Sequence, residues 1–179
     1  MSQLIKDCKV KKNRMEFKEV KTTEEIDCLV GLIQEIWPEV FISIIGKEQV
    51  DYMLVHYQGK DVIISEIEQG VRYFFIEDFD RPIGYFAYSP EEDHLLISKV
   101  YLKKEFRGLG LSSRVFLYFE ETARNEKKDK LFLHVNRSNK QAVEVYSHRG
   151  FKIVKTVDQP LGDKFFLNDY WMEKKVDVL

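Results

Sequence analysis

The chain is poor in cysteine, with only Cys8 and Cys28 among its 179 residues. Two thiols are too few for a disulfide framework or for a four-cysteine zinc site. Neither sign of charge dominates, since 28 lysines and arginines stand against 30 aspartates and glutamates, and this balance argues against a protein that coats nucleic acid. No run approaches the roughly 20 apolar residues that cross a bilayer, and the N-terminus has no apolar signal core. We therefore expect a soluble, reduced, cytoplasmic protein without nucleic-acid or membrane partners.

The composition indicates one folded domain behind a basic tail. With 44% apolar and 32% charged residues, the chain is neither disordered nor fibrous, and at this length it should bury about 70% of its unfolded surface. Residues 1–14 are crowded with lysine and arginine and show little periodicity. We expect them to form a solvated, flexible tail, with a tether to nucleic acid or membrane as the alternative. Residues 15–179 are predicted to form the single domain.

The first part of this domain reads as one strand followed by helices. A strand is expected over residues 16–20, and Thr22 with Glu25 forms a capping box that starts a helix. Apolar residues then recur at helical spacing until Pro38, which is expected to end that helix. Two shorter helices are expected over residues 50–57 and 62–67.

From residue 71 the hydrophobic period changes to two, which is typical of strands. Three strands come first, and a helix, a strand, a helix and two final strands follow. The expected ranges are 71–77, 83–88, 95–102, 111–125, 131–136, 139–148, 151–156 and 165–174. This order predicts an α/β (mixed α+β) fold, with a mixed, mostly antiparallel central sheet and helices on both faces.

The most informative segment, Arg107-Gly108-Leu109-Gly110-Leu111-Ser112, joins the third of these strands to a helix. Glycines at such a place let the backbone turn tightly and approach a ligand closely. The unpaired amides of the first helical turn then converge into an anion site, to which Arg107 can add charge-assisted hydrogen bonds. A pyrophosphate would fit this loop; a plain turn capped by Ser112 is the alternative.

Other glycine-rich motifs do not fit this segment. The dinucleotide fingerprint G-x-G-x-x-G fails because Ser113 occupies its third glycine position. The loop also lacks the Gly-Lys-Ser/Thr of a P-loop and the G-x-S-x-G of a nucleophile elbow. A nicotinamide-dependent oxidoreductase is therefore disfavoured.

Two segments resemble the motifs of the GNAT superfamily, the acyl-CoA-dependent N-acyltransferases. Residues 105–110 are similar to motif A, Q/R-x-x-G-x-G/A; both glycines match, and Glu105 replaces the first Gln or Arg. A second stretch is similar to motif B, N-x-x-A-x-x-x-Y-x-x-x-G-F, and the residues that match it are Asn139, Ala142, Tyr146, Gly150 and Phe151. The resemblance covers roughly residues 17–176.

The resemblance implies a three-layer fold in which strands 95–102 and 131–136 run parallel and splay apart at their ends. Acetyl-CoA, as co-substrate, would enter that gap. Its pantetheine arm would pair with the edge of Val100 to Leu102, and its pyrophosphate would bind the amides of residues 107–112. The cofactor-binding residues implied in this way are Val100, Tyr101, Leu102, Arg107, Gly108, Leu109, Gly110, Leu111, Ser112 and Asn139.

The implied reaction is acetyl transfer to a primary amine by direct attack in a ternary complex. The amine would be a small molecule such as a polyamine, or a peptide or protein amine. The Val100 N–H would be the oxyanion donor and Tyr146 the catalytic acid. A GNAT-shaped module that binds acyl-CoA or a protein partner without turnover is the alternative.

Several roles stay open at this stage. Tyr146 also fits a buried aromatic four residues after Ala142, and Asn139 also fits a helix start. A water chain is the alternative to a single base, and the candidate bases, each also explicable as a surface charge, are Glu66, Glu77, His94 and Asp169. Aromatic residues that could line an acceptor pocket, or belong to the core, are Trp37, Phe41, Tyr52, Tyr57 and Tyr170. Acidic residues that could favour a cationic amine, or form a solvated face, are Glu66, Glu68, Glu77, Asp78 and Asp80.

Neither a metal nor an oligomeric state is indicated by the sequence. The four histidines, at positions 56, 94, 134 and 148, show no metal-ligand spacing, and no acidic cluster completes a site. We therefore expect no metal. A homodimer is left open beside a monomer.

Overall fold

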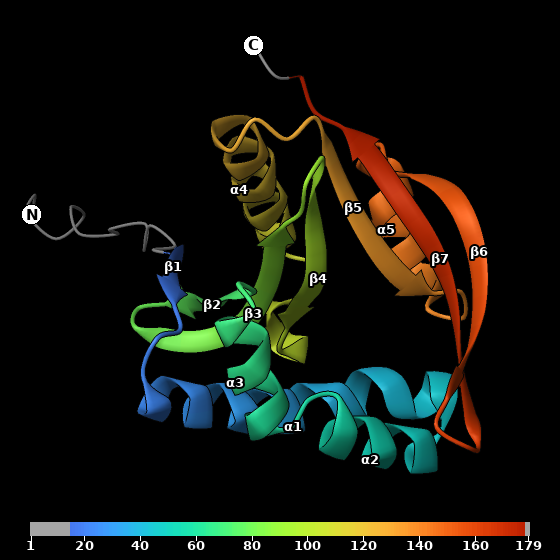
Figure 1. Ribbon diagram of the computed structural model, residues 1–179. Coiled ribbons are helices and arrows are strands. Elements are labelled where there is room, and N and C mark those ends of the chain that lie inside the picture. The colour runs from blue at the N-terminus through green and yellow to red at the C-terminus, as the bar shows by residue number, and fades with distance from the viewer. Residues whose placement is uncertain (1–14, 178–179) are drawn as a thin grey trace, which may run out of the picture.

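The computed structural model describes residues 15–177, so the predicted basic tail over residues 1–14 lies outside the described residues. Its elements follow one another along the chain as shown in Figure 1. They are β1 (Met15–Glu19), α1 (Thr23–Ile45), α2 (Lys47–His56), α3 (Lys60–Glu68), β2 (Arg72–Asp78), β3 (Arg81–Pro90), β4 (His94–Leu102), a short 3₁₀ helix (Lys104–Phe106), α4 (Leu111–Asn125), β5 (Lys130–Asn136), α5 (Lys140–His148), β6 (Lys152–Leu161) and β7 (Phe165–Lys175).

The strands form one seven-stranded sheet in the order β1-β2-β3-β4-β5-β7-β6. Every pair of neighbours is antiparallel except β4 and β5, which are parallel. A strand–helix–strand crossover through α4 makes that parallel pair, as the resemblance to the GNAT motifs implies. The mixed, mostly antiparallel α/β fold is thereby confirmed.

Helix α1 begins where the sequence predicts and ends later. The capping box forms, with the Glu25 N–H donating to Thr22 Oγ1 (3.2 Å) and the Thr22 N–H donating to Glu25 Oε2 (3.0 Å). The prediction that Pro38 ends this helix is wrong, because α1 runs through it to Ile45. Proline removes one backbone hydrogen bond and crowds the preceding turn, but the turn beyond it buries Phe41 at 8% exposure. Burial of that side chain offsets the local cost.

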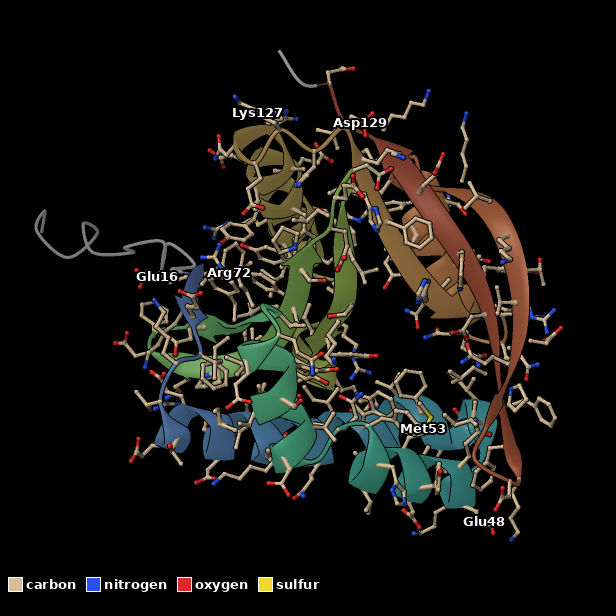
Figure 2. All side chains as sticks on the ribbon, viewed as in Figure 1. Glu16, Glu48, Met53, Arg72, Lys127 and Asp129 are labelled. Carbon is tan, nitrogen blue, oxygen red and sulfur yellow. The ribbon has the colours of Figure 1, made fainter. Side chains whose placement is uncertain are left out.

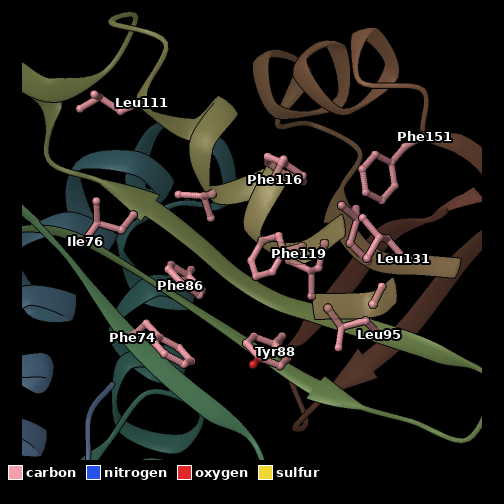
Figure 3. Close-up of a cluster of buried hydrophobic side chains, with 14 of the residues drawn as sticks. Phe74, Ile76, Phe86, Tyr88, Leu95, Leu111, Phe116, Phe119, Leu131 and Phe151 are labelled. Atoms are coloured by element: carbon pink, nitrogen blue, oxygen red, sulfur yellow. The ribbon is translucent and has the colours of Figure 1, made fainter. Parts of the chain in front are cut away.

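The core has two layers, one on each side of the sheet. Beneath α1 and α3, the side chains of Leu29, Ile33 and Ile36 pack with aromatic residues of β2 and β3. On the opposite face, α4 contributes Phe116 and Phe119, and Phe119 meets Phe86 of β3 edge-on with ring centroids 5.2 Å apart. Figure 3 shows this second cluster between α4 and the sheet. Helices therefore cover both faces, as predicted.

Helix α1 bears on the expectation that no segment is long and apolar enough to cross a membrane. Its 23 residues reach a mean hydropathy of 1.6 over the most apolar window, of which 33% is buried, so by length and composition alone it could cross a membrane. The expectation that no stretch is long and apolar enough is thus wrong. A core helix meets the same criteria, and Leu29, Ile33 and Ile36 are at most 1% exposed against the sheet. Packing against the sheet therefore accounts for the apolar residues on this side of the helix.

The pairing between β4 and β5 is short. It runs from His94 opposite Lys130 to Ile97 opposite Leu133 and stops there. At the same point β4 contains a β-bulge on its other side, because Tyr88 pairs with Ile97 and Ala87 with Lys99, so Ser98 is left without a partner. A bulge bends its strand. Strand β4 therefore turns away from β5 beyond Ile97, and the two strands diverge toward their C-terminal ends (Figure 1).

The last two strands extend beyond their predicted ranges. Strand β6 continues to Leu161 rather than residue 156, because β7 pairs with it along its whole length. It tolerates Pro160 because it is an edge strand, where a missing N–H need not break a ladder bond. The far end of this hairpin reaches α2, where Lys164 pairs with Glu48 at 2.8 Å; Glu48 is labelled in Figure 2.

Gly84 allows the close approach of β3 to β4, and a larger residue at this position is predicted to destabilise the fold. A Cβ at this position would lie 2.3 Å from the Tyr101 carbonyl oxygen and 2.8 Å from Leu102 Cδ2. We expect Gly84→Ala to lower the free energy of unfolding by about 1–3 kcal/mol, as overpacking does, measured by denaturant titration. Gly31→Ala is the control. Gly31 lies inside α1, and a Cβ added there would project into open space, with no contact within 4 Å. The substitution should therefore raise the free energy of unfolding by about 0.5–1 kcal/mol. Equal stability of Gly84→Ala and the wild type would contradict the prediction.

Candidate functional site

A cavity of about 270 Å³ lies where β4 and β5 diverge. Both strands contribute to its walls beyond their last shared pair, and the remaining walls come from α1, the β4–α4 loop, α4 and α5. Side chains project into this region from both strands (Figure 2). The lining residues are Val40, Phe41, Ile97, Ser98, Lys99, Val100, Tyr101, Leu102, Arg107, Gly108, Ser112, Phe116, Leu133, His134, Val135, Asn136, Asn139, Gln141, Ala142, Val145 and Tyr146.

The end of β4 presents an unpaired backbone edge to this cavity. The Lys103 N–H donates to the Ile83 carbonyl of β3 at 2.9 Å. Because peptide groups alternate along a strand, those of Val100 and Leu102 point the other way, toward the gap. The Leu102 carbonyl confirms this direction, since it accepts a hydrogen bond from Arg107 Nε at 2.8 Å on that side. The remaining groups of this edge are available to an extended ligand.

The loop between β4 and α4 leaves a series of amides free. Among the described residues, the N–H groups of residues 108–112 have no backbone or side-chain acceptor. Gly108 and Gly110 have φ values of 72° and 75°, a left-handed conformation that favours glycine. Gly110 is the N-cap of α4 and no side chain caps the helix, so the alternative of a turn capped by Ser112 is wrong. Free amides at the N-terminus of a helix are a favourable arrangement for binding an anion.

Arg107 links this loop to the end of β4 and to α1 through hydrogen bonds. Besides its bond to Leu102, its guanidinium donates through Nη1 to Glu39 Oε1 of α1 at 2.8 Å. Its Nη2 atom is buried without a hydrogen-bond partner among the described residues. Two of its three nitrogens are therefore engaged within the protein, and one remains for a ligand in the cavity.

Arg149 lies at the same end of α4, and sequence reasoning did not identify it. Its Nη2 donates to Ser112 Oγ at 3.1 Å and to Ser113 Oγ at 3.0 Å. The guanidinium also lies over the Phe116 ring, 4.7 Å from the centroid. Burial lowers the pKa of Arg149, although Glu120 and Tyr146 oppose that shift. Its serine partners lie more than 30 residues earlier in the chain, so no local pattern marked this cation.

Tyr146 of α5 and Asn139, the residue that precedes this helix, both line the cavity. The Tyr146 ring packs near Phe116 and Phe151, with centroids 5.8 Å and 6.0 Å apart. Burial raises its pKa to about 12, against an opposing effect of Arg149, so the phenol is protonated at neutral pH. Asn139 is the N-cap of α5, with Oδ1 accepting the Ala142 N–H at 3.2 Å. Its predicted helix-start role is confirmed, and it lines the cavity as well.

The cavity brings together most of the predicted site residues. Those that line it are Val100, Tyr101, Leu102, Arg107, Gly108, Ser112, Asn139 and Tyr146. Leu109, Gly110 and Leu111 do not line it: the Leu109 side chain is exposed and that of Leu111 is buried in the core. For these three, any role in the loop rests on their backbone.

The predicted bases are placed elsewhere, and none of the four lines the cavity. Glu66 binds Lys99 Nζ at 3.0 Å and accepts a hydrogen bond from the Tyr73 hydroxyl. His94 contacts Asp93 at the start of β4, at 2.7 Å, which is the end away from the gap. The other two are Glu77 on β2 and Asp169 on β7. The acidic residues at 68, 77, 78 and 80 are also absent from the lining.

Of the predicted acceptor-pocket aromatics, only Phe41 lines the cavity. Trp37 is in the core, where its Nε1 donates to the Tyr85 hydroxyl at 3.1 Å. Tyr52 packs on Phe165 of the distant β6–β7 hairpin, with ring centroids 5.3 Å apart. Tyr57 and Tyr170 are likewise absent from the lining. Among residues 15–177, no group of three or more His, Cys, Asp or Glu could hold a metal ion.

The arrangement of sheet, gap and loop matches solved acetyltransferase structures. The PaiA N-acetyltransferase of Thermoplasma acidophilum, in complex with coenzyme A, superimposes with a TM-score of 0.75 at 19% identity, covering 90% of this chain and 98% of that one. The ribosomal-protein-S18-alanine N-acetyltransferase of Escherichia coli gives 0.69 at 12% identity, with 92% and 96% covered. Ard1 of Thermoplasma volcanium gives 0.67 at 17% identity, with 91% and 98% covered. At these identities the likeness establishes the fold class.

The family follows from the sequence match. The model of the acetyltransferase (GNAT) family matches residues 32–151, more than half of the chain. The chain therefore belongs to the GNAT family of acetyltransferases, and the resemblance of its motifs is confirmed. Its activity is that of an acyl-CoA-dependent acetyltransferase.

Proposed function

We propose that this protein transfers the acetyl group of acetyl-CoA to a primary amine by direct attack within a ternary complex. The observation that carries the proposal is the cavity between β4 and β5, which combines an unpaired strand edge with a loop of free amides. A linear ligand that ends in a pyrophosphate complements both features. The acceptor is a small amine, such as a polyamine, or an amine of a peptide or protein.

The strand edge and the loop have separate tasks in holding acetyl-CoA. The pantetheine arm carries amide groups, which pair with the peptide groups of Val100 and Leu102 as an added strand would. The pyrophosphate binds the free amides of residues 108–112, where the dipole of α4 also favours negative charge. Arg107 Nη2 and the nearby Arg149 add positive charge at this end. Together they direct the thioester into the gap.

The reaction requires a donor for the oxygen of the thioester carbonyl. When a neutral amine attacks the carbonyl carbon, that oxygen becomes negatively charged. The Val100 N–H points into the gap and is free once β4 has left β5, so we assign it as the oxyanion donor. A fixed donor of this kind contributes about 3–4 kcal/mol of transition-state stabilisation.

The departing thiolate requires a proton, and the position of Tyr146 in the cavity lining supports it as the donor. Its hydroxyl has no hydrogen-bond partner among the described residues, and it faces the cavity from α5. Because its pKa is raised to about 12, the proton is present at neutral pH. We assign Tyr146 as the acid that protonates the sulfur as the C–S bond breaks.

The proposal is tested by measuring thiol release from acetyl-CoA across a panel of polyamines and of peptides with free N-termini or lysines. Release that depends on an acceptor, with an acetylated product of the expected mass, supports it and identifies the amine class. Tight binding of coenzyme A by calorimetry without acceptor-dependent release would show a binding module instead.

A side chain at position 110 is predicted to weaken coenzyme A binding. Gly110 has a φ of 75°, which a β-branched residue adopts only with strain, so Gly110→Val should distort the amide cradle. We expect the Kd for coenzyme A to rise at least tenfold by calorimetry. Leu109→Ala is the control, because its side chain is 64% exposed and the amide is retained; its Kd should stay within twofold. Undiminished affinity in Gly110→Val would remove the loop from the binding site.

Removal of the Tyr146 hydroxyl is predicted to slow turnover while leaving cofactor binding intact. We expect Tyr146→Phe to lower kcat by at least tenfold, because the thiolate loses its proton donor. The Kd for coenzyme A should not change, since the ring still packs on Phe116 and Phe151. Tyr118→Phe is the control, because this tyrosine packs beside Phe17 and Phe74 away from the cavity. Equal kcat for Tyr146→Phe and the wild type would make Tyr146 a packing residue only.

A further inference from the structure

His134 occupies a distinctive position on β5. It follows Leu133, the last residue of β5 that pairs with β4, and it lines the cavity. Side chains alternate along a strand; those of Leu133 and Val135 lie in the core beside α4, so His134 points to the opposite face. There α1 and α3 cover β2 and β3, whereas the near side of β5 and β7 is uncovered in Figure 1. His134 and Tyr146 therefore approach the gap from opposite faces of the sheet.

Neighbouring aromatic rings hold the imidazole in place. The His134 ring stacks on Trp171 of β7 at 4.9 Å with an interplanar angle of 24°, and it meets Phe132 edge-on at 5.4 Å. The ammonium group of Lys155 on β6 in turn makes a cation–π contact with Trp171, 4.6 Å from the centroid of its ring. Neither ring nitrogen of His134 has a hydrogen-bond partner within residues 15–177. The ring is thus oriented by packing, while its nitrogens are left available.

Burial and a neighbouring imidazole favour the neutral form of His134. Burial, and then the proximity of His94 on β4, lower its pKa below 6.5. From the other strands of this face, β7 places Asp169 and Glu173 opposite Asn136 and Phe132, and β6 supplies Lys155. On β4, the charge of Lys99 is balanced by an ion pair with Glu66, whose carboxylate oxygen lies 3.0 Å from Lys99 Nζ. A neutral imidazole accepts a proton readily.

Acetyl transfer creates a proton that must be removed. After attack on the thioester, the amine nitrogen is positively charged, and its proton has to leave before the amide is stable. Apart from His134, the ionisable side chains among the cavity-lining residues are Lys99, Tyr101, Arg107 and Tyr146. Lys99 and Arg107 are ion-paired with carboxylates, and burial raises the pKa of both tyrosines. His134 is the lining side chain able to accept the proton.

We propose that His134 is the general base of the reaction, an inference that rests on the proposed function. The amine nitrogen forms a bond to the acetyl carbon, and the unprotonated ring nitrogen of His134 takes the proton from that nitrogen. The C–S bond then breaks, and the sulfur leaves with the proton of Tyr146. His134 subsequently releases its proton to solvent through the open face, and Tyr146 takes up a proton from solvent in the cavity. The products are the N-acetylated amine and coenzyme A.

The test is the pH dependence of kcat/KM for the best acceptor found in the panel, in wild type and in His134→Gln. The reaction needs a neutral amine and a neutral imidazole. In wild type, log(kcat/KM) should therefore rise with a slope of two below the pKa of His134 and of one above it. In His134→Gln the slope should be one throughout, and kcat/KM at pH 7 should fall about 10²- to 10⁴-fold, with the Kd for coenzyme A unchanged.

His94→Gln is the matched control, because it removes the neighbouring imidazole on the same face outside the cavity. It should keep both slopes, with the break shifted to slightly higher pH since one cation is lost. His134→Ala provides a second variant, and added imidazole should restore part of its rate through the uncovered face.

Three results would overturn the assignment while wild type remains active. They are retention of both slopes in His134→Gln, loss of the steeper slope in Asp169→Asn instead, and a slow His134→Ala that imidazole does not rescue. Absence of acceptor-dependent thiol release in wild type would overturn the proposed function itself.

Discussion

The unpaired residue Ser98 is the local feature on which the site depends. An unbroken β4 would continue its pairing with β5, and the peptide groups of Val100 and Leu102 would be consumed by the sheet. With the bulge, pairing stops at Ile97 and Leu133, and the same groups become an edge for a ligand. A sheet interior is normally closed by its own hydrogen bonds, so this fold obtains a polar cleft by leaving a few of them unmade.

In the proposed mechanism, the opened sheet divides the reaction between its two faces. The β4–α4 loop, α4 and α5 lie on one face, and with them Tyr146. His134 belongs to the other face, which α1 to α3 leave partly uncovered. A thioester lying in the gap would thus meet an acid from the cofactor side and a base from the acceptor side.

Sequence reasoning predicted what local spacing encodes. Gly108, Gly110 and the strand-to-helix change around them indicated the free amides, and the resemblance to the GNAT motifs implied the parallel β4–β5 pair. It failed at Pro38, where burial of Phe41 outweighs a local helix breaker. It also did not identify Arg149 or His134, because their proposed roles depend on contacts with Ser112 and Trp171, which lie far away in sequence. Such contacts follow from tertiary packing, and periodicity carries no information on them.

Glu105, where the motif has glutamine or arginine, shows which part of the loop matters. The amides of residues 108–112 remain free despite this replacement, because the two left-handed glycines set the backbone. Two ion pairs then fix the loop against α1: Lys103 with Glu35 at 2.9 Å and Arg107 with Glu39 at 2.8 Å. Since Glu35 and Glu39 are one helical turn apart, they hold both cations along one face of α1. The proposed anion site is thus built from backbone, and side chains serve chiefly to keep that backbone in place.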